Sequence, residues 1–325
     1  MRNEMVEIMG NENSKDGIGQ DTAMTGASGA VAAALLDGLI DYAGLFPPAD
    51  LSLEAMVDHY ASYLKCEQSW VLGRVLVPVG MLEAFASLAP LPRDQGDDPW
   101  CVNALVSPSG DAQLSNDLDV ISAFNHKHSD PANGHCLVDA VDLKASDALS
   151  IDTALDLMPD ELMPFFELPV NSDIRGHVAA LSGSVAGAKV RTGGIVPEAY
   201  PSPEAVSEFL LACIRADVPF KATAGLHHAL CSRNEQVGAD EFGFLNVFLG
   251  AALARACRLD HEELAEVLQE RSSEAFVFEE TSISWRNHEI GIEEIVQSRI
   301  EGAISYGSCA FDEPLNDLRH LGLII

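Results

Sequence analysis

Apolar and polar positions follow one repeating pattern along most of this chain. Short runs rich in apolar and β-branched residues each end in a polar or Gly/Pro turn, and an amphipathic stretch then follows. Such an alternation predicts parallel strands that are joined by helices. The predicted strands span residues 39–46, 71–78, 101–106, 136–143, 164–169, 187–192, 219–224 and 303–308.

Helical stretches lie between these strands, for example at 52–65 and 202–216. The second begins with Ser202 followed by Pro203, which is typical of an N-cap with proline at the first helical position. Eight is the number of strands that closes a TIM barrel. We therefore predict an α/β fold, a single (β/α)8 TIM barrel domain over residues 28–325.

A long connection, residues 229–302, precedes the last predicted strand. It carries two helical patterns, near 242–257 and 261–271. Residues 276–290 alternate as in a β-hairpin, so we interpret this connection as a β-hairpin and helical insertion in the barrel. Alternatively, residues 39–46 precede the barrel without forming one of its strands, and residues 276–290 supply a barrel strand instead.

The first forty residues contain two further patterns. Residues 1–27 are polar, contain glycine and show no period, so they are predicted to form a flexible tail. The apolar run 29–40 is too short to span a bilayer and is interrupted by Asp37, so we expect a helix that packs on the domain. No other run approaches a membrane span, which predicts a soluble protein.

The charge balance is strongly acidic. Nineteen Lys and Arg against 50 Asp and Glu give a net charge of −31, which opposes broad contact with nucleic acid or an anionic membrane. The seven cysteines are scattered and include no CxxC, which favours a reducing cytoplasm over a disulfide framework or a zinc site. We expect a cytoplasmic protein with a small-molecule substrate, no cofactor and no bound metal; a homo-oligomer is left open.

Charged side chains occur inside several predicted strands. Because side chains alternate along a strand, Lys189 shares a face with Arg191, and Lys221 shares a face with Thr223. Charged groups inside a barrel are costly unless they are paired or functional, and the active sites of TIM barrels lie at the C-terminal ends of the strands. The four charged residues that we expect to meet at one mouth of the barrel are Asp142, Glu167, Lys189 and Lys221.

Other residues near the strand ends have weaker signals. Asp41 and Tyr42, in the first predicted strand, could face the same pocket. His227 and His228 follow a strand end and are expected to line the pocket mouth and contact an anion. Cys309 is interpreted as a small packing residue.

Five short motifs resemble the deoxyribose-phosphate aldolase family, class I aldolases with a TIM barrel. They are "AVDLK" at 140–144, "FFEL" at 165–168, "KVRTG" at 189–193, "KATAGL" at 221–226 and "ISYGSCAF" at 304–311. The likeness covers roughly residues 136–310, while the first 135 residues look more like an uncharacterised bacterial protein group.

The resemblance implies roles for individual residues. Lys189 would be the Schiff-base lysine, Lys221 the second lysine and Asp142 the proton-relay acid, with Glu167 on the glutamate-bearing strand. The turn at Gly307 and Ser308 would hold a substrate phosphate. The chain departs from the family's pattern at Arg191, which replaces a small hydroxyl residue, at His227-His228, and at Asp312 and Glu313 beside the phosphate turn.

The chemistry expected from these residues is that of a class I aldolase-like lyase. One lysine forms an imine with a small carbonyl substrate, and a neighbouring cation lowers the pKa of that lysine. Segments 187–194 and 218–230 contain no acid, so the substrate is expected to carry an anionic group. The expected substrate-binding residues are Arg191, Thr223, His227, His228, Gly307 and Ser308.

The sequence is also consistent with three other hypotheses. The lysines and carboxylates could form a purely structural ion network. His227 or His228 could serve a metal-assisted lyase or isomerase together with Glu167 and Asp142. The barrel could also bind a small anion without catalysing a reaction.

Overall fold

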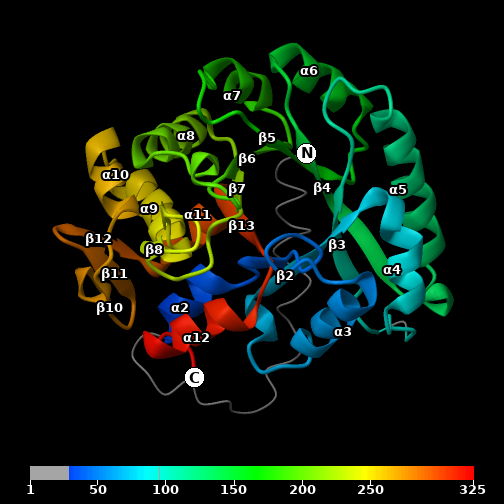
Figure 1. Cartoon of the computed structure of the whole chain (residues 1–325), viewed down its shortest axis with the longest axis horizontal. Coiled ribbons are helices and arrows are strands. Elements are labelled where there is room, and N and C mark those ends of the chain that lie inside the picture. Colours follow the sequence, from blue (N-terminus) through cyan, green and yellow to red (C-terminus); the bar gives the residue numbers. More distant parts are fainter. Residues whose placement is uncertain (1–28, 95) are drawn as a thin grey trace.

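Eight parallel strands close into a barrel in this computed structural model, which describes residues 29–94 and 96–325 (Figure 1). The order around the barrel is β1-β13-β7-β6-β5-β4-β3-β2. The strands are β1 (Ile40–Tyr42), β2 (Leu72–Pro78), β3 (Trp100–Leu105), β4 (Cys136–Lys144), β5 (Met163–Glu167), β6 (Gly187–Arg191), β7 (Phe220–Thr223) and β13 (Ala303–Ser308). The predicted (β/α)8 barrel is confirmed, and each predicted strand overlaps one barrel strand.

The helices form an outer ring around the strands in Figure 1. They are α2 (Gly29–Leu36), α3 (Leu53–Tyr63), α4 (Leu82–Leu88), α5 (Leu114–His128), α6 (Ala148–Leu157), α7 (Arg175–Leu181), α8 (Pro203–Ala216), α9 (Phe244–Cys257), α10 (His261–Leu268), α11 (Ile292–Glu301) and α12 (Asp312–His320). The predicted cap of α8 is present, since Ser202 Oγ accepts a hydrogen bond from the backbone N–H of Ala205. The predicted tail 1–27 lies outside the described residues.

The insertion between β7 and β13 carries two small antiparallel sheets. One consists of β8 (Ser232–Asn234) and β9 (Ala239–Glu241), and the other of β10 (Phe276–Phe278), β11 (Ser282–Trp285) and β12 (His288–Gly291). Residues 276–290 therefore supply no barrel strand, and β1 is a full member of the barrel. The predicted hairpin gains a third strand through a second turn, in which Arg286 adopts a positive φ of 54°.

The helix α9 explains why the insertion is stable. Apart from Asn246 and Arg255, its residues are apolar or glycine, and 11 of its 14 residues are buried. It packs against α8, α10, α11 and β12, so apolar neighbours surround it. A helix without a polar face needs such complete cover.

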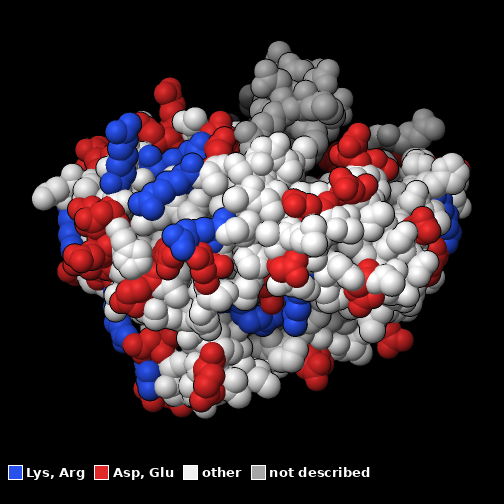
Figure 2. All heavy atoms as spheres, turned by 90° about the horizontal axis from the view of Figure 1, so that it is seen from above, with Lys and Arg blue, Asp and Glu red and all other residues white. Residues whose placement is uncertain are grey.

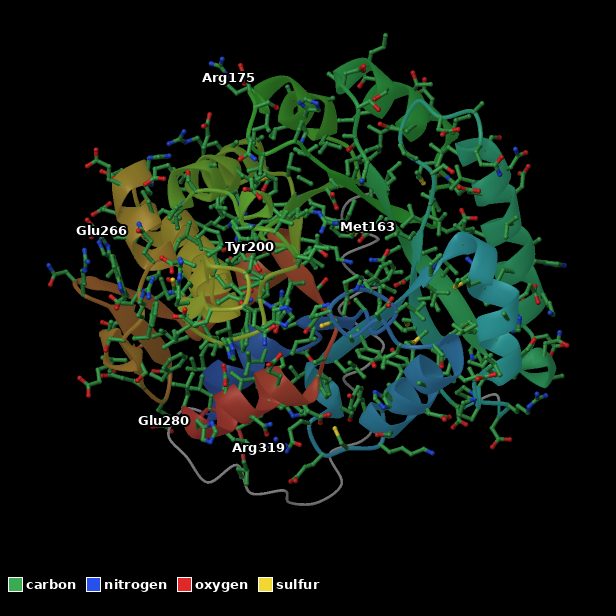
Figure 3. The ribbon with its side chains drawn as sticks, viewed as in Figure 1. Met163, Arg175, Tyr200, Glu266, Glu280 and Arg319 are labelled. Atoms are coloured by element: carbon green, nitrogen blue, oxygen red, sulfur yellow. The ribbon has the colours of Figure 1, made fainter. Side chains whose placement is uncertain are left out.

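The barrel strands present apolar side chains toward the helices, whereas the interior near the C-terminal ends of the strands is mainly polar. Outward-facing strand residues such as Val102, Val141 and Phe166 join the large core beneath the helices. A separate small cluster, Met163 with Ala140 and Phe165, is also buried; Met163 is labelled in Figure 3. Seven polar residues of the barrel strands are almost fully buried and need partners, because buried polar groups without partners are costly. These are Asp41, Asn103, Asp142, Lys189, Lys221, Ser305 and Ser308.

The outer surface reflects the acidic composition. Acidic side chains are spread over the face shown in Figure 2, and basic side chains in that view lie mainly toward one end. Among the described residues, no helix is both long and apolar enough to cross a membrane.

Candidate active site

Strand register brings the predicted charged residues side by side. Glu167 is the register partner of Lys189, Lys189 is the partner of Lys221, and Lys221 is the partner of Ser305. These four positions form one row around the barrel, although they span 139 positions of the sequence from 167 to 305. Neighbouring strands lie about 4.8 Å apart, so their long side chains can meet inside the barrel.

The side chains of this row join others in a chain of alternating charge, here called the charged chain. It runs from the rim of the barrel into the interior. Its members, in order, are Arg191, Glu167, Lys189, Asp142, Lys221 and Asp41, and the successive nitrogen–oxygen distances are 3.3, 3.4, 2.7, 3.6 and 2.5 Å.

Asp142 lies at the middle of the charged chain. Its Oδ2 accepts a hydrogen bond from Lys189 Nζ at 2.7 Å, and its Oδ1 lies 3.6 Å from Lys221 Nζ. Asn103 Nδ2 donates a further hydrogen bond to Oδ1 at 2.9 Å. Burial acts to raise the pKa of Asp142, but the two lysines and these hydrogen bonds outweigh burial and hold the pKa at about 2. Asp142 is therefore a carboxylate at neutral pH.

Lys189 shows the opposite effect to the one expected from the sequence. Burial acts to lower its pKa, but Asp142 and Glu167 raise the pKa above its ordinary value. The expected lowering by a neighbouring cation was wrong as a description of the resting protein, because carboxylates from other strands stand between the cations. Lys189 is an ammonium group at rest.

Lys221 is more enclosed than Lys189. Its Nζ lies 2.5 Å from Asp41 Oδ2 and 5.0 Å from the centre of the Phe165 ring, and its side chain is 2% exposed. The ammonium is within ion-pair distance of two carboxylates but makes no aligned hydrogen bond. Asp41 is itself fixed by Ser305 Oγ and by the backbone N–H of Arg74, each at 2.8 Å.

The expected local excess of positive charge is absent from the site. Each cation of the charged chain contacts at least one carboxylate. The charged chain consists of three cations and three carboxylates. The acid-free segments 187–194 and 218–230 are neutralised by β1, β4 and β5. Only Arg191, whose side chain is 47% exposed, presents a cation toward solvent.

The two histidines lie apart from the charged chain. His227 Nδ1 is 3.3 Å from Glu313 Oε2, and His228 Nδ1 is 3.1 Å from Asp317 Oδ2. Both carboxylates belong to α12. Glu167 contacts Lys189 and Arg191 instead, and among the described residues no three His, Cys, Asp or Glu side chains are arranged to hold a metal ion.

The turn after β13 is closed by its own hydrogen bonds. Ser308 Oγ donates to the carbonyl of Ala310 at 2.6 Å, and Ser308 is 4% exposed. Gly307 is the register partner of Thr223 on β7. The expected phosphate contact at Ser308 would therefore have to replace an internal hydrogen bond, close to the carboxylates of Asp312 and Glu313.

Two cavities open among the loops that follow the strands. One, of about 350 Å³, is lined by residues that include Tyr200, Glu241 and Arg271, and the other, of about 390 Å³, by residues that include Ser109 and Ser150. The hydroxyl of Tyr200, labelled in Figure 3, lies 2.7 Å from Glu241 Oε1 and 3.0 Å from the carbonyl oxygen of Gly194, so its one proton can be donated to either acceptor. Neither cavity is lined by the charged chain, so the site is better defined by its ion pairs than by a hollow.

Three members of the site carry little signal in the sequence. Asn103 and Ser305 are uncharged residues within apolar strands, and only the alternation of side chains could have pointed to them. Asp41 was noted as facing the pocket, but its pairing with Lys221 depends on closure of the barrel between β1 and β13.

Comparison with protein-family models, with curated proteins and with solved structures found no match to this chain.

Proposed function

We propose that the charged chain is the active site of a class I aldolase-like carbon–carbon lyase, in which Lys189 forms an imine with a small carbonyl substrate. The observation that carries this proposal is the arrangement of Asp142 between two lysine ammonium groups, one of which lies nearer the rim. A buried carboxylate in hydrogen-bond contact with an amine can take its proton when a substrate arrives.

Exposure along the charged chain favours Lys189 over Lys221 as the imine-forming residue. Side-chain exposure falls from 47% at Arg191 to 13% at Glu167, 6% at Lys189 and 2% at Lys221. Lys221 is also enclosed by Asp41 and the ring of Phe165. A substrate that enters from the rim meets Lys189 first.

The raised pKa of Lys189 supports imine chemistry in a different way from the one expected. It means that the surrounding carboxylates favour a positive charge at Nζ. A protonated imine places a positive charge on the same nitrogen, so the oxygens that stabilise the ammonium would also stabilise the iminium. The cost falls on the preceding step, in which the ammonium must lose a proton to Asp142, 2.7 Å away.

The carbon–carbon bond would then break toward the iminium. Asp142 or Glu167 takes the proton of the substrate's β-hydroxyl, directly or through water, and the bonding electrons pass into the iminium to give an enamine. Protonation of the enamine carbon and hydrolysis release the product and restore Lys189. Lys221, 3.6 Å from Asp142, keeps that carboxylate ionised for the proton transfer.

The proposed substrate is a small aldehyde or ketone with an anionic group near the rim. Arg191 is the half-exposed cation there, and Thr223 is its register partner on β7. These two residues are the best placed of the expected substrate-binding residues. His227, His228 and Ser308 are engaged with α12 carboxylates or backbone, and we assign them no contact with the reacting carbonyl.

The test is exchange of the substrate's α-hydrogens in D2O, followed by proton NMR with a panel of small aldehydes and ketones. An enamine intermediate exchanges these hydrogens with solvent even when no carbon–carbon bond is broken. Lys189→Arg is the matched variant, because it keeps the cation beside Asp142 and forms no imine. We expect exchange with at least one compound in the wild type and none with Lys189→Arg; exchange at the wild-type rate in the variant would refute the proposal.

A further inference from the structure

A cavity of about 350 Å³ lies between the connection from β6 to α8 and the insertion that follows β7. This volume is within the usual range for small-molecule sites, roughly 300–1,000 Å³. The cavity has an apolar wall and a few charged side chains, and it contains no member of the charged chain. The lining residues that decide its chemistry are Tyr200, Pro203, Asp240, Glu241, Phe242 and Arg271.

Glu241, the last residue of β9, is a buried carboxylate that has no counter-charge. Its side chain lines the cavity although the residue is only 4% exposed. Oε1 lies 2.7 Å from the Tyr200 hydroxyl and 2.7 Å from Asn234 Nδ2, and both of these groups are neutral at pH 7. In the part of the chain that the structure describes, no Lys, Arg or His side chain pairs with Glu241, and no donor contacts Oε2.

The cations near this carboxylate are engaged elsewhere. Arg271, at the cavity wall, pairs with Asp240 Oδ2 at 2.8 Å, so the neighbouring acid offsets its charge. His227 is close enough to feel the charge of Glu241, but its Nδ1 pairs with Glu313 Oε2 at 3.3 Å. The charge left over in the cavity is therefore that of Glu241. A buried charge is costly unless it is paired, and a cationic ligand would supply the missing partner.

We propose that this cavity binds a small organic cation, a primary ammonium compound with a short apolar chain. The ammonium group donates hydrogen bonds to Glu241 Oε2, since it carries three donors and the oxygen has no other partner. The apolar chain packs against Tyr200, Pro203 and Phe242. The net charge of −31 also favours the approach of cations over that of anions. Binding at this site involves no imine and no chemical step.

Tyr200 connects the cavity to the end of β6. Its hydroxyl lies 3.0 Å from the carbonyl oxygen of Gly194 as well as 2.7 Å from Glu241, and a Cβ added at Gly193 would lie 2.9 Å from its ring. A ligand held between Glu241 and Tyr200 therefore restrains two segments at once, residues 193–201 and residues 239–242. Slower amide exchange in these two segments is the expected sign that the ligand has bound here.

The test is titration calorimetry at pH 7 with n-butylammonium, and with n-butanol and butyrate as neutral and anionic compounds of matched size. We expect saturable binding of n-butylammonium at one site, and binding of the other two that is at least about tenfold weaker. Hydrogen–deuterium exchange measured by mass spectrometry should show n-butylammonium slowing exchange in residues 193–201 and 239–242. No saturable binding, equal affinity for n-butanol, or no protection of these two segments would overturn the proposal.

Three variants locate the binding charge. Glu241→Gln keeps an acceptor for Tyr200 and Asn234 but removes the charge, so it should weaken n-butylammonium binding at least about tenfold. Glu208→Gln removes an equal charge from an exposed position of α8 and should leave binding unchanged. Lys189→Arg should also bind with wild-type affinity, which separates this site from the imine site. Circular dichroism checks each fold, and wild-type affinity in folded Glu241→Gln would refute the role of this carboxylate.

Discussion

Asp142 is the residue on which the charged chain depends, because it is the only member that contacts both lysines. Its pKa is about 2 in the folded protein, against an ordinary value of 3.8. A folded-state pKa below the unfolded value stabilises the fold above the unfolded pKa, and this stabilisation is lost as pH falls toward the folded pKa. The window for Asp142 is therefore pH 4 to 2, and the contribution is about 2 kcal/mol.

The variant Asp142→Asn tests this contribution to stability. The amide keeps the shape but leaves two buried ammonium groups without their shared carboxylate, so we expect a loss of about 3–5 kcal/mol at pH 7. We also expect the free energy of unfolding to change less between pH 4 and pH 2 than in the wild type. Urea denaturation across this range measures both quantities.

Glu83→Gln is the control for that experiment. Glu83 pairs with Lys127 at 2.6 Å, but both side chains are about half exposed, and such pairs contribute little to stability. If the urea denaturation curves of Asp142→Asn coincide with those of Glu83→Gln, the charged chain contributes no more to the free energy of unfolding than an exposed ion pair does.

The connection between β6 and α8 makes a close backbone contact with the segment that follows β7. Gly193 follows β6, and a Cβ added there would lie 2.7 Å from the Cα of Gly225, which follows β7. Thr192 Oγ1 donates to the carbonyl of Ala224 at 2.5 Å and ties the same two strand ends together. The close approach holds the two lysine-bearing strands in register.

Gly193→Ala should therefore weaken the site. The new methyl group meets backbone atoms that cannot rotate away, so the ends of β6 and β7 must separate. We expect lower stability and a slower rate of α-hydrogen exchange, measured by thermal unfolding and by NMR. Gly176→Ala in α7 is the control, since a Cβ there meets no atom within 4 Å, and it should leave exchange unchanged and stabilise the helix by about 0.5–1 kcal/mol. Wild-type exchange in Gly193→Ala would contradict this role of the connection.

At the scale of the whole molecule, the barrel could be predicted because each of its strands is a short apolar run between turns. The strands β8, β9 and β12 could not, since each has only three or four residues and little apolar character. Their place is set by contacts with the rest of the insertion.

The site could be predicted only in part for a related reason. Lys189 and Lys221 stand out within their own strands, but their partners come from other strands. Asp41 meets Ser305 across 264 positions of sequence, and Asp142 meets Lys189 across 47. The sequence around Lys189 contains no acid, and a neighbouring cation was expected to lower the pKa of Lys189. The folded chain instead surrounds Lys189 with carboxylates, and its pKa rises.

Borohydride trapping, with the modified lysine located by peptide mass spectrometry, tests most directly whether Lys189 forms an imine. We predict that wild-type protein, reduced in the presence of its carbonyl substrate, gains one adduct on Lys189 and none on the half-exposed or exposed lysines. Lys189→Arg, with the charged chain still paired, should gain no adduct. A purely structural ion network would give no adduct at Lys189 with any aldehyde or ketone of a broad panel. In that case Lys189→Ala would only lose about 3–5 kcal/mol of stability. That result would contradict the proposed imine at Lys189.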